Sequence, residues 1–155
     1  MYTRVLLGVF FFFAMGSINA QETVAERLQQ CNLEKGLALQ GYDPVSYFVE
    51  GKAIKGLKSV ALYHQGVTYW FTNNSHKELF KKNPSKYEPA YGGWCAYAMG
   101  AKGEKVEVDP ETFKIVDGRL LLFYNKFFNN TLVTWNKEEQ TLKAKADANW
   151  NKFLH

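Results

Sequence analysis

Three side chains in this sequence are the candidate ligands for a soft metal ion. Cys95 lies in the stretch "YGGWCAYAMG", which begins at Tyr91, and Met99 follows it four residues later. His76 stands earlier in the chain, just after an apolar segment. A thiolate binds metals and attacks electrophiles, histidine is a common metal ligand and the usual base beside a cysteine, and a thioether suits Cu(I). We therefore expect Cys95, with His76 or Met99, to form a low-coordinate metal site.

Other roles for Cys95 fit the same sequence. A thiol that retains no metal would be the centre of a redox or thiol-transfer protein, with a small thiol or an oxidant as its partner. Free cysteine is also among the most buried residue types, and a methionine among aromatic residues commonly fills a core. A disulfide between Cys31 and Cys95 is a further alternative in an exported protein. The last alternative is a scaffold or ligand-binding domain with an aromatic pocket, in which the sulfur of Cys95 is inert.

Motifs for catalysis are missing from the chain. We find no Ser-His-Asp order, no paired carboxylates and no phosphate-cradling loop. The two cysteines form no Cys-x-x-Cys motif, so a thioredoxin-type pair and a zinc knuckle are not expected. We therefore assign no catalytic residues and favour a protein that is not an enzyme.

The first twenty residues have the pattern of a secretory signal peptide. Met1–Arg4 carries one positive charge, residues 5–15 are mostly Leu, Val and Phe, and Ala20 ends the segment before polar Gln21. The apolar run is shorter than the ~20 residues that a membrane-spanning helix needs. We expect residues 1–20 to be cleaved and residues 21–155 to form one periplasmic or secreted domain without a membrane span.

Charge and composition restrict the classes of partner. The 155 residues include 19 Lys and Arg and 15 Asp and Glu, and the formal net charge is +4. The lysines are scattered along the chain, whereas nucleic-acid binding needs a concentrated basic surface. Aromatic residues make up 16% of the sequence, which favours a tightly packed core or a lined pocket. Nucleic acid is therefore not an expected partner.

Periodicity and turn residues predict an α+β fold, a small single domain of antiparallel β-hairpins with a short central helix and N- and C-terminal helices. The predicted elements are an N-terminal helix over Val24 to Leu39, a short strand over Val45 to Phe48, hairpin strands over Ser59 to Tyr63 and Val67 to Phe71, further hairpin strands over Thr112 to Val116 and Arg119 to Tyr124 around Asp117-Gly118, and a helical tail from Lys137. The apolar stripe of the helical C-terminal segment consists of Trp135, Leu142, Ala146, Trp150 and Phe153.

The central helix is the element that would position His76. Ser75-x-x-Glu78 fits a capping box, and the helix should stop before Pro84 because the residue preceding a proline disfavours helical geometry. His76 would then lie in the first turn of this helix.

Four separated motifs resemble those of the exported YHS-domain proteins of bacteria. They are "GYDPVSYF", "VTYWFTNNSHKELFKKNPSKYEPAYGGWCAYAMG", "DGRLLLFYN" and "ADANW", and they occur in the right order from about Gly41 to Trp150. The YHS core itself is similar to the region from Val45 to Tyr87. The resemblance implies a metal-binding role, with copper as the metal, because shorter YHS domains occur in copper-transporting ATPases.

The resemblance also bears on Cys95. The paired cysteines of many short YHS domains are missing between Val45 and Tyr87, and the cysteine nearest this core follows it. Some members of the exported branch are selenoproteins, with selenocysteine at the position that matches Cys95. By that resemblance, Cys95 would have a role in chemistry or ligation rather than in packing.

We predict that the mature protein begins at or near Gln21, because the apolar run is short and ends on a small residue. N-terminal sequencing of the protein recovered outside the cytoplasm checks this. Retention of Met1 in a membrane fraction would contradict it.

Overall fold

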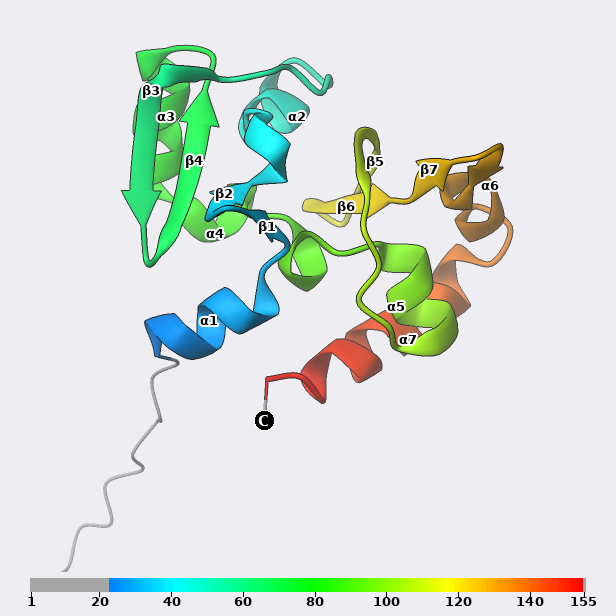
Figure 1. The fold of residues 1–155 in the computed structure, drawn as a ribbon. Helices are drawn as coiled ribbons and strands as arrows, with labels where there is room; N and C mark the ends of the chain where they lie inside the picture. The colour runs from blue at the N-terminus through cyan, green and yellow to red at the C-terminus, as the bar shows by residue number, and fades with distance from the viewer. Residues whose placement is uncertain (1–22, 155) are drawn as a thin grey trace, which may run out of the picture.

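The computed structural model describes residues 23–154, so the predicted signal peptide at residues 1–20 lies outside the described residues. Helices and small antiparallel sheets alternate along the chain, which confirms the expected α+β class (Figure 1). The first half forms α1 (Val24–Gln30), β1 (Leu33–Glu34), β2 (Leu37–Ala38), η1 (Leu39–Gly41), α2 (Ser46–Val49), β3 (Leu57–His64), β4 (Val67–Phe71), α3 (Asn74–Lys82) and α4 (Pro84–Tyr87). The second half forms η2 (Ala90–Gly93), α5 (Ala96–Lys102), β5 (Asp109–Val116), β6 (Arg119–Phe123), β7 (Asn125–Lys126), β8 (Asn129–Asn130), α6 (Thr131–Trp135) and α7 (Glu139–Asn151).

Both predicted hairpins are confirmed. β3 and β4 pair antiparallel, and their sheet continues through a parallel pairing of Leu37 in β2 with Thr68 in β4, which gives the order β1-β2-β4-β3. β5 and β6 pair antiparallel around Asp117 and Gly118, whose φ angles are 51° and 71°. Two positive φ angles are what a two-residue turn of the I′ type requires, and glycine adopts them without strain.

The N-terminal helix is shorter than predicted, because α1 ends at Gln30 instead of continuing to Leu39. The amide of Asn32 bonds to the carbonyl of Gly92 at 2.8 Å, so a long-range partner replaces the helical one. Lys35 and Gly36 then form a left-handed turn that joins β1 to β2. A local sequence pattern does not reveal this long-range contact that ends the helix.

Residues Val45 to Phe48 are also not the predicted strand, because Ser46–Val49 form the short helix α2. The side chain of Asp43 accepts a hydrogen bond from the Val45 amide at 2.8 Å, and a turn held in this way competes with strand pairing. The N-cap of α3 is Asn73, which accepts from the amide of His76, rather than Ser75 of the predicted capping box. Asparagine and serine are comparable N-caps, so the shift costs the helix little.

Strand β6 is buried on both faces and separates the two hydrophobic clusters of the molecule. Leu120 and Leu122 belong to the first cluster, which is built mainly by the N-terminal half. Leu121 and Phe123 point the other way, into a second cluster formed with α5, α6 and α7. Successive side chains of a strand point to opposite faces, so an unbroken apolar run fits a strand that is covered on both sides.

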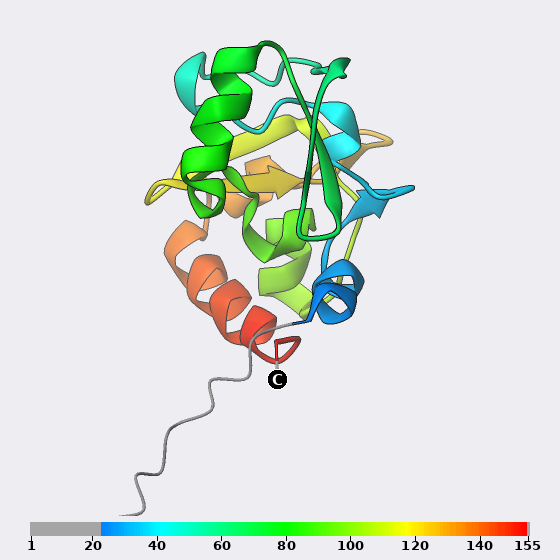
Figure 2. The same ribbon diagram turned by 90° about the vertical axis from the view of Figure 1, so that its left-hand side faces the viewer.

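The predicted apolar stripe of the C-terminal segment lies in this second cluster. The segment forms two helices, α6 and α7, and the longer one packs against α5 (Figure 2). A Cβ atom on Gly100 of α5 would lie 2.5 Å from the carbonyl oxygen of Leu142, so this close helix contact requires glycine. None of the helices within residues 23–154 is long and apolar enough to cross a membrane.

We expect Gly118→Val to lower the free energy of unfolding by about 1 kcal/mol or more, because a β-branched residue tolerates positive φ poorly. A Cβ atom on Gly118 would have open space within 4 Å among the described residues, so the loss reports backbone conformation rather than a clash. Gly118→Asn is the control, since asparagine visits this region more readily. Urea denaturation measures both, and equal midpoints for the valine variant and the wild type would contradict the turn.

Candidate functional site

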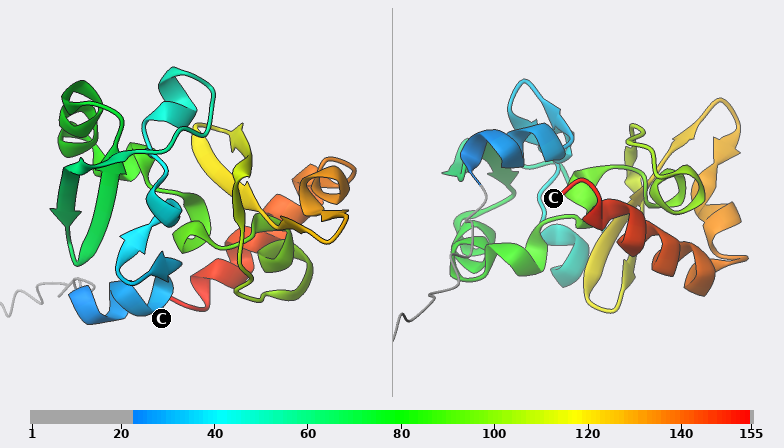
Figure 3. Two further views of the ribbon diagram at one scale, coloured as in Figure 1. Left: turned by 45° about the horizontal axis from the view of Figure 1, so that its top comes forward. Right: turned by 90° about the horizontal axis from the view of Figure 1, so that it is seen from below.

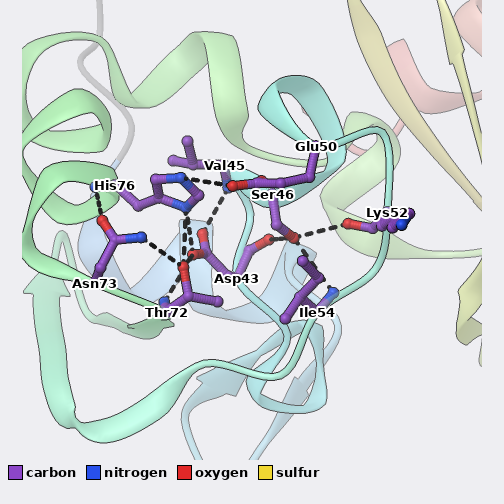
Figure 4. Close-up of polar contacts among 9 residues, drawn as sticks. All are labelled: Asp43, Val45, Ser46, Glu50, Lys52, Ile54, Thr72, Asn73 and His76. Atoms are coloured by element: carbon purple, nitrogen blue, oxygen red, sulfur yellow. Dashed lines mark hydrogen bonds and ion pairs between the residues drawn. The ribbon is translucent and has the colours of Figure 1, made fainter.

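His76 lies in the first turn of α3, as predicted, but its side chain is buried between two carboxylates. Its Nδ1 atom is 2.7 Å from Oδ2 of Asp43, and its Nε2 atom is 3.1 Å from Oε1 of Glu50 (Figure 4). The Asn73 cap fixes the start of the helix and therefore the position of the imidazole ring. The histidine thus joins α3 to the segment around α2.

Asp43 is fully buried and has a complete set of partners. Its Oδ2 atom also accepts hydrogen bonds from the amide and the hydroxyl of Thr72, both at 2.8 Å, while Oδ1 accepts from the Val45 amide. Ser46 closes the same loop, because its hydroxyl lies 2.8 Å from the Asp43 carbonyl and 2.9 Å from that of Lys52. A buried network in which each member is satisfied makes the structure rigid and specific. We therefore interpret the Asp43–His76 cluster as structural.

Cys95 is fully buried in the first hydrophobic cluster. It caps α5, and its backbone bridges Leu122 of β6 in a parallel arrangement. The Tyr124 amide donates a hydrogen bond to Sγ at 3.3 Å, and the Thr131 hydroxyl lies 3.5 Å from the same atom. No disulfide joins Cys31 to Cys95, so that alternative is not realised in the structure.

The predicted ligands Cys95, His76 and Met99 are not brought together. Met99 follows Cys95 by one helical turn, but its side chain belongs to the second cluster, with Phe123 and Trp135. His76 is held at Asp43, on a different element. Within residues 23–154, no group of three or more His, Cys, Asp or Glu side chains is placed to hold a metal ion.

A cavity of about 320 Å³ lies elsewhere, between α1, η2 and the end of α7. These three segments are far apart in the sequence but lie close together near the C-terminus (Figure 3). The volume is at the lower end of the range for small-molecule sites. Its polar lining includes Arg27, Glu88, Tyr69, Arg119 and Lys86, and its apolar lining includes Leu33, Leu39, Pro89, Tyr91, Trp150 and Leu154.

One wall of the cavity is the Arg27–Glu88–Tyr69 cluster. The guanidinium of Arg27 forms an ion pair with Glu88, and the Tyr69 hydroxyl donates to the same carboxylate at 2.9 Å. Burial lowers the pKa of Arg27, but the charge and hydrogen bond of Glu88, together with Tyr69 and Cys31, hold the pKa above its usual value. The Nε atom of Arg27 is buried and has no hydrogen-bond partner among the described residues.

The second wall contains Arg119, which begins β6. Its Nη1 atom donates to Oδ1 of Asp147 at 2.8 Å, and its guanidinium lies over the ring of Tyr91. Burial opposes ionisation of Asp147, but hydrogen bonds from Arg119 and Tyr91 prevail and keep the pKa of this carboxyl below its usual value. Burial, followed by the hydrogen bond to Asp147, raises the pKa of Tyr91. Arg119 therefore stays a fixed cation at the cavity.

Cys31 lines this cavity and is half-buried at the C-cap of α1. Arg27 and Lys105 both interact electrostatically with it. The predicted helix to Leu39 would have enclosed Cys31, but because α1 ends at Gln30, Cys31 lies at the end of the helix.

The glycines before Cys95 serve the same region. A Cβ atom on Gly92 would lie 2.4 Å from the carbonyl oxygen of Gln30, and the indole of Trp94 donates to that oxygen at 2.7 Å. The backbone therefore approaches closely at Gly92, and this contact holds the end of α1 against η2. The stretch that drew attention to Cys95 forms part of the wall beside Cys31.

Sequence reasoning missed the cavity because its charged residues come from separate segments. Arg27, Glu88 and Arg119 lie on α1, beyond α4 and on β6, and no short spacing connects them. The glycine pair was the one local signal of a close contact in this region. No protein-family model, curated protein or solved structure significantly matches the chain, so the resemblance to exported YHS-domain proteins rests on the sequence motifs.

We expect Asp43→Ala to lower the free energy of unfolding by about 3 kcal/mol, because it leaves buried donors of Val45 and Thr72 without an acceptor. Glu50→Ala is the matched control and should cost less than about 1 kcal/mol, because Glu50 is partly exposed. Both are measured by urea denaturation with a chelator present. Equal losses, or no loss without metal, would contradict a structural role for the cluster.

We expect Cys31 to react with an aromatic disulfide reagent in the native protein, and Cys95 to react only after unfolding, because Cys95 is fully buried. Cys31→Ser should remove the native reaction, and Cys95→Ser should keep it. Thiol titration with and without denaturant measures this. A native thiol that still reacts in Cys31→Ser would show that Cys95 is accessible.

Proposed function

We propose that this chain is an exported, non-catalytic binding protein whose cavity takes up a small amphipathic anion. The observation that carries the proposal is the cavity between α1, η2 and α7, with an arginine on each of two walls and aromatic and aliphatic side chains between them. Small-molecule sites commonly combine an apolar lining with a few polar groups that fix orientation.

The charges of the lining favour an anionic group. The lining contains three basic residues, Arg27, Lys86 and Arg119, and one acidic residue, Glu88. A guanidinium donates paired hydrogen bonds to carboxylate, sulfonate or phosphate oxygens. The apolar surface of Leu33, Leu39 and Trp150 would cover the body of the ligand. A carboxylate, sulfonate or phosphate on an aromatic or aliphatic body is therefore the proposed ligand class.

Export and membership of the YHS-domain proteins remain proposals that the sequence motifs support. The two described features that agree with them are the α+β fold and helices too short to span a membrane. A small binding domain would fit a periplasmic or secreted location, where it meets ligands before they enter the cell.

The sequence-based hypothesis of a copper site at Cys95 has weaker support. Its three predicted donors lie in separate surroundings, so metal binding there would require β6 and α3 to move apart from their present partners. Metal analysis of protein purified under reducing conditions tests this hypothesis directly. A stoichiometric soft metal that is lost in Cys95→Ser would support it over the cavity.

A thiol-based function has one observation in its favour, but at the other cysteine. Cys31 lines the cavity and interacts electrostatically with Arg27 and Lys105, whereas Cys95 does not line the cavity. Exchange of the Cys31 thiolate with a small disulfide would form a mixed disulfide and release the second half as a thiolate. Mass spectrometry of protein incubated with such a disulfide would show the adduct on Cys31 and not on Cys95.

A matched pair of fluorescent ligands tests the anion site. Anilinonaphthalene sulfonate carries a sulfonate on an aromatic body, and phenylnaphthylamine is a similar body without the charge. We expect the wild type to bind the sulfonate at least about tenfold more tightly, corresponding to about 1.4 kcal/mol. Arg119→Gln and Arg27→Gln should each reduce this preference.

Lys58→Gln on β3 is the control, because it removes one exposed positive charge away from the cavity. Melting temperatures confirm that each variant is folded before binding is compared. Equal affinity for the two ligands, or an unchanged preference in both arginine variants, would overturn the anion site.

A further inference from the structure

The turn between β7 and β8 consists of two exposed phenylalanines in an unfavourable backbone conformation. Phe127 and Phe128 have φ angles of 52° and 62°. Their side chains are 88% and 112% exposed. Bulky residues are rare at positive φ, and aromatic side chains rarely project fully into water. The positive φ angles and the exposed rings both lower the stability of the folded state. The need to fold therefore does not explain why phenylalanine occupies these two positions.

Three other two-residue turns in this chain have a different residue in their second position. The two-residue turns Lys35-Gly36, Gln65-Gly66 and Asp117-Gly118 have the same pair of positive φ angles, and each has glycine in second position. Glycine meets this requirement without strain. The Phe-Phe turn departs from the sequence rule that the other hairpins follow. Strain that persists in a well-held segment is a reason to look for function.

The hairpin is held firmly at its base. The amide and the hydroxyl of Thr131 donate to the Tyr124 carbonyl at 3.0 and 2.9 Å, and the Asn125 side chain donates to Thr112 at 2.9 Å. The Asn130 side chain caps α6. The two aromatic rings are therefore presented by a fixed support, at the edge of the molecule opposite β3 and α3 (Figure 1).

We propose that the Phe127–Phe128 turn inserts into the surface of an anionic lipid bilayer. From Asn125 to Lys137 the sequence contains two lysines, Lys126 and Lys137, and no acidic residue. Both lysines are exposed. Aromatic residues settle at the boundary between headgroups and acyl chains, and lysines beside them attract anionic headgroups. Val133 on α6 adds a further exposed apolar side chain to the same segment.

The size and shape of the tip favour a bilayer over a protein partner. Two aromatic side chains bury about 150–250 Å² each. A stable protein interface buries about 800 Å² on each partner. A narrow turn covers little of that area, whereas insertion into lipid needs no complementary protein surface. The inference is independent of the cavity, so either can fail without the other.

The test is cosedimentation of the full chain with vesicles of phosphatidylglycerol and phosphatidylcholine. We expect binding to mixed vesicles and a loss of at least about tenfold in affinity for the double variant Phe127→Asn, Phe128→Gly. Asn-Gly is the preferred pair for this turn, so the variant should melt at the same temperature or higher. Any affinity contributed by residues 1–20 cancels, because both proteins carry the same N-terminus.

Two single variants complete the design. Tyr63→Ser removes an exposed aromatic ring on β3 and should leave binding unchanged. Lys126→Gln should weaken binding to anionic vesicles and reduce its dependence on salt. Equal vesicle binding by the wild type and the Asn-Gly variant would overturn the proposal. A dimer that the Asn-Gly variant dissociates, with vesicle binding unchanged, would also overturn it and assign the turn to contacts between copies.

Discussion

Burial of β6 on both faces is the constraint on which the rest of the structure depends. A strand covered on both sides needs an apolar side chain at each position and a partner layer on each face. Leu120 and Leu122 pack against the half that contains the four-stranded sheet. Leu121 and Phe123 pack against the helices α5, α6 and α7. Cys95 enters this arrangement through its backbone bridge to Leu122. Cys95 is fully buried beside this strand.

The structure contains two polar clusters of different character. Around Asp43 the donors of Val45 and Thr72 are matched within the protein, and none of these residues lines the cavity. At the cavity, the guanidinium groups of Arg27 and Arg119 are paired but also border open space. A satisfied buried cluster determines a fold, whereas partly solvated cations beside apolar walls can still bind a ligand.

The features that sequence reasoning predicted correctly are those with local causes. The hairpin around Asp117-Gly118 follows from a dipeptide. The end of the helix that carries His76 follows from the proline after it, although Asn73 rather than Ser75 caps its start. The end of α1 depends on Asn32 meeting Gly92, some sixty residues away. Helix α2 follows a local turn at Asp43, whose side chain also accepts from Thr72, just beyond β4. No local pattern contains the contact of Asn32 with Gly92 or that of Asp43 with Thr72.

The candidate site was predictable to a smaller extent than the fold. His76 was placed correctly on its helix, but its neighbours Asp43 and Glu50 come from a loop whose path the sequence did not reveal. The cavity needs α1, η2 and α7 to meet, and Arg27 and Arg119 are separated by most of the chain. Residue types indicated what chemistry was available, while only tertiary structure determined which groups could act together.

The central position of β6 also bears on the order in which the chain can fold during synthesis. The N-terminal half supplies most of the first hydrophobic cluster, yet that cluster is incomplete until Leu120 and Leu122 are present. The second cluster is completed later in synthesis, because it includes Ala146 of α7. A chain that emerges from the ribosome N-terminus first therefore keeps apolar surface uncovered until its last third appears. Exposed apolar surface of this kind makes the growing chain prone to aggregation until the last third of the sequence has been synthesised.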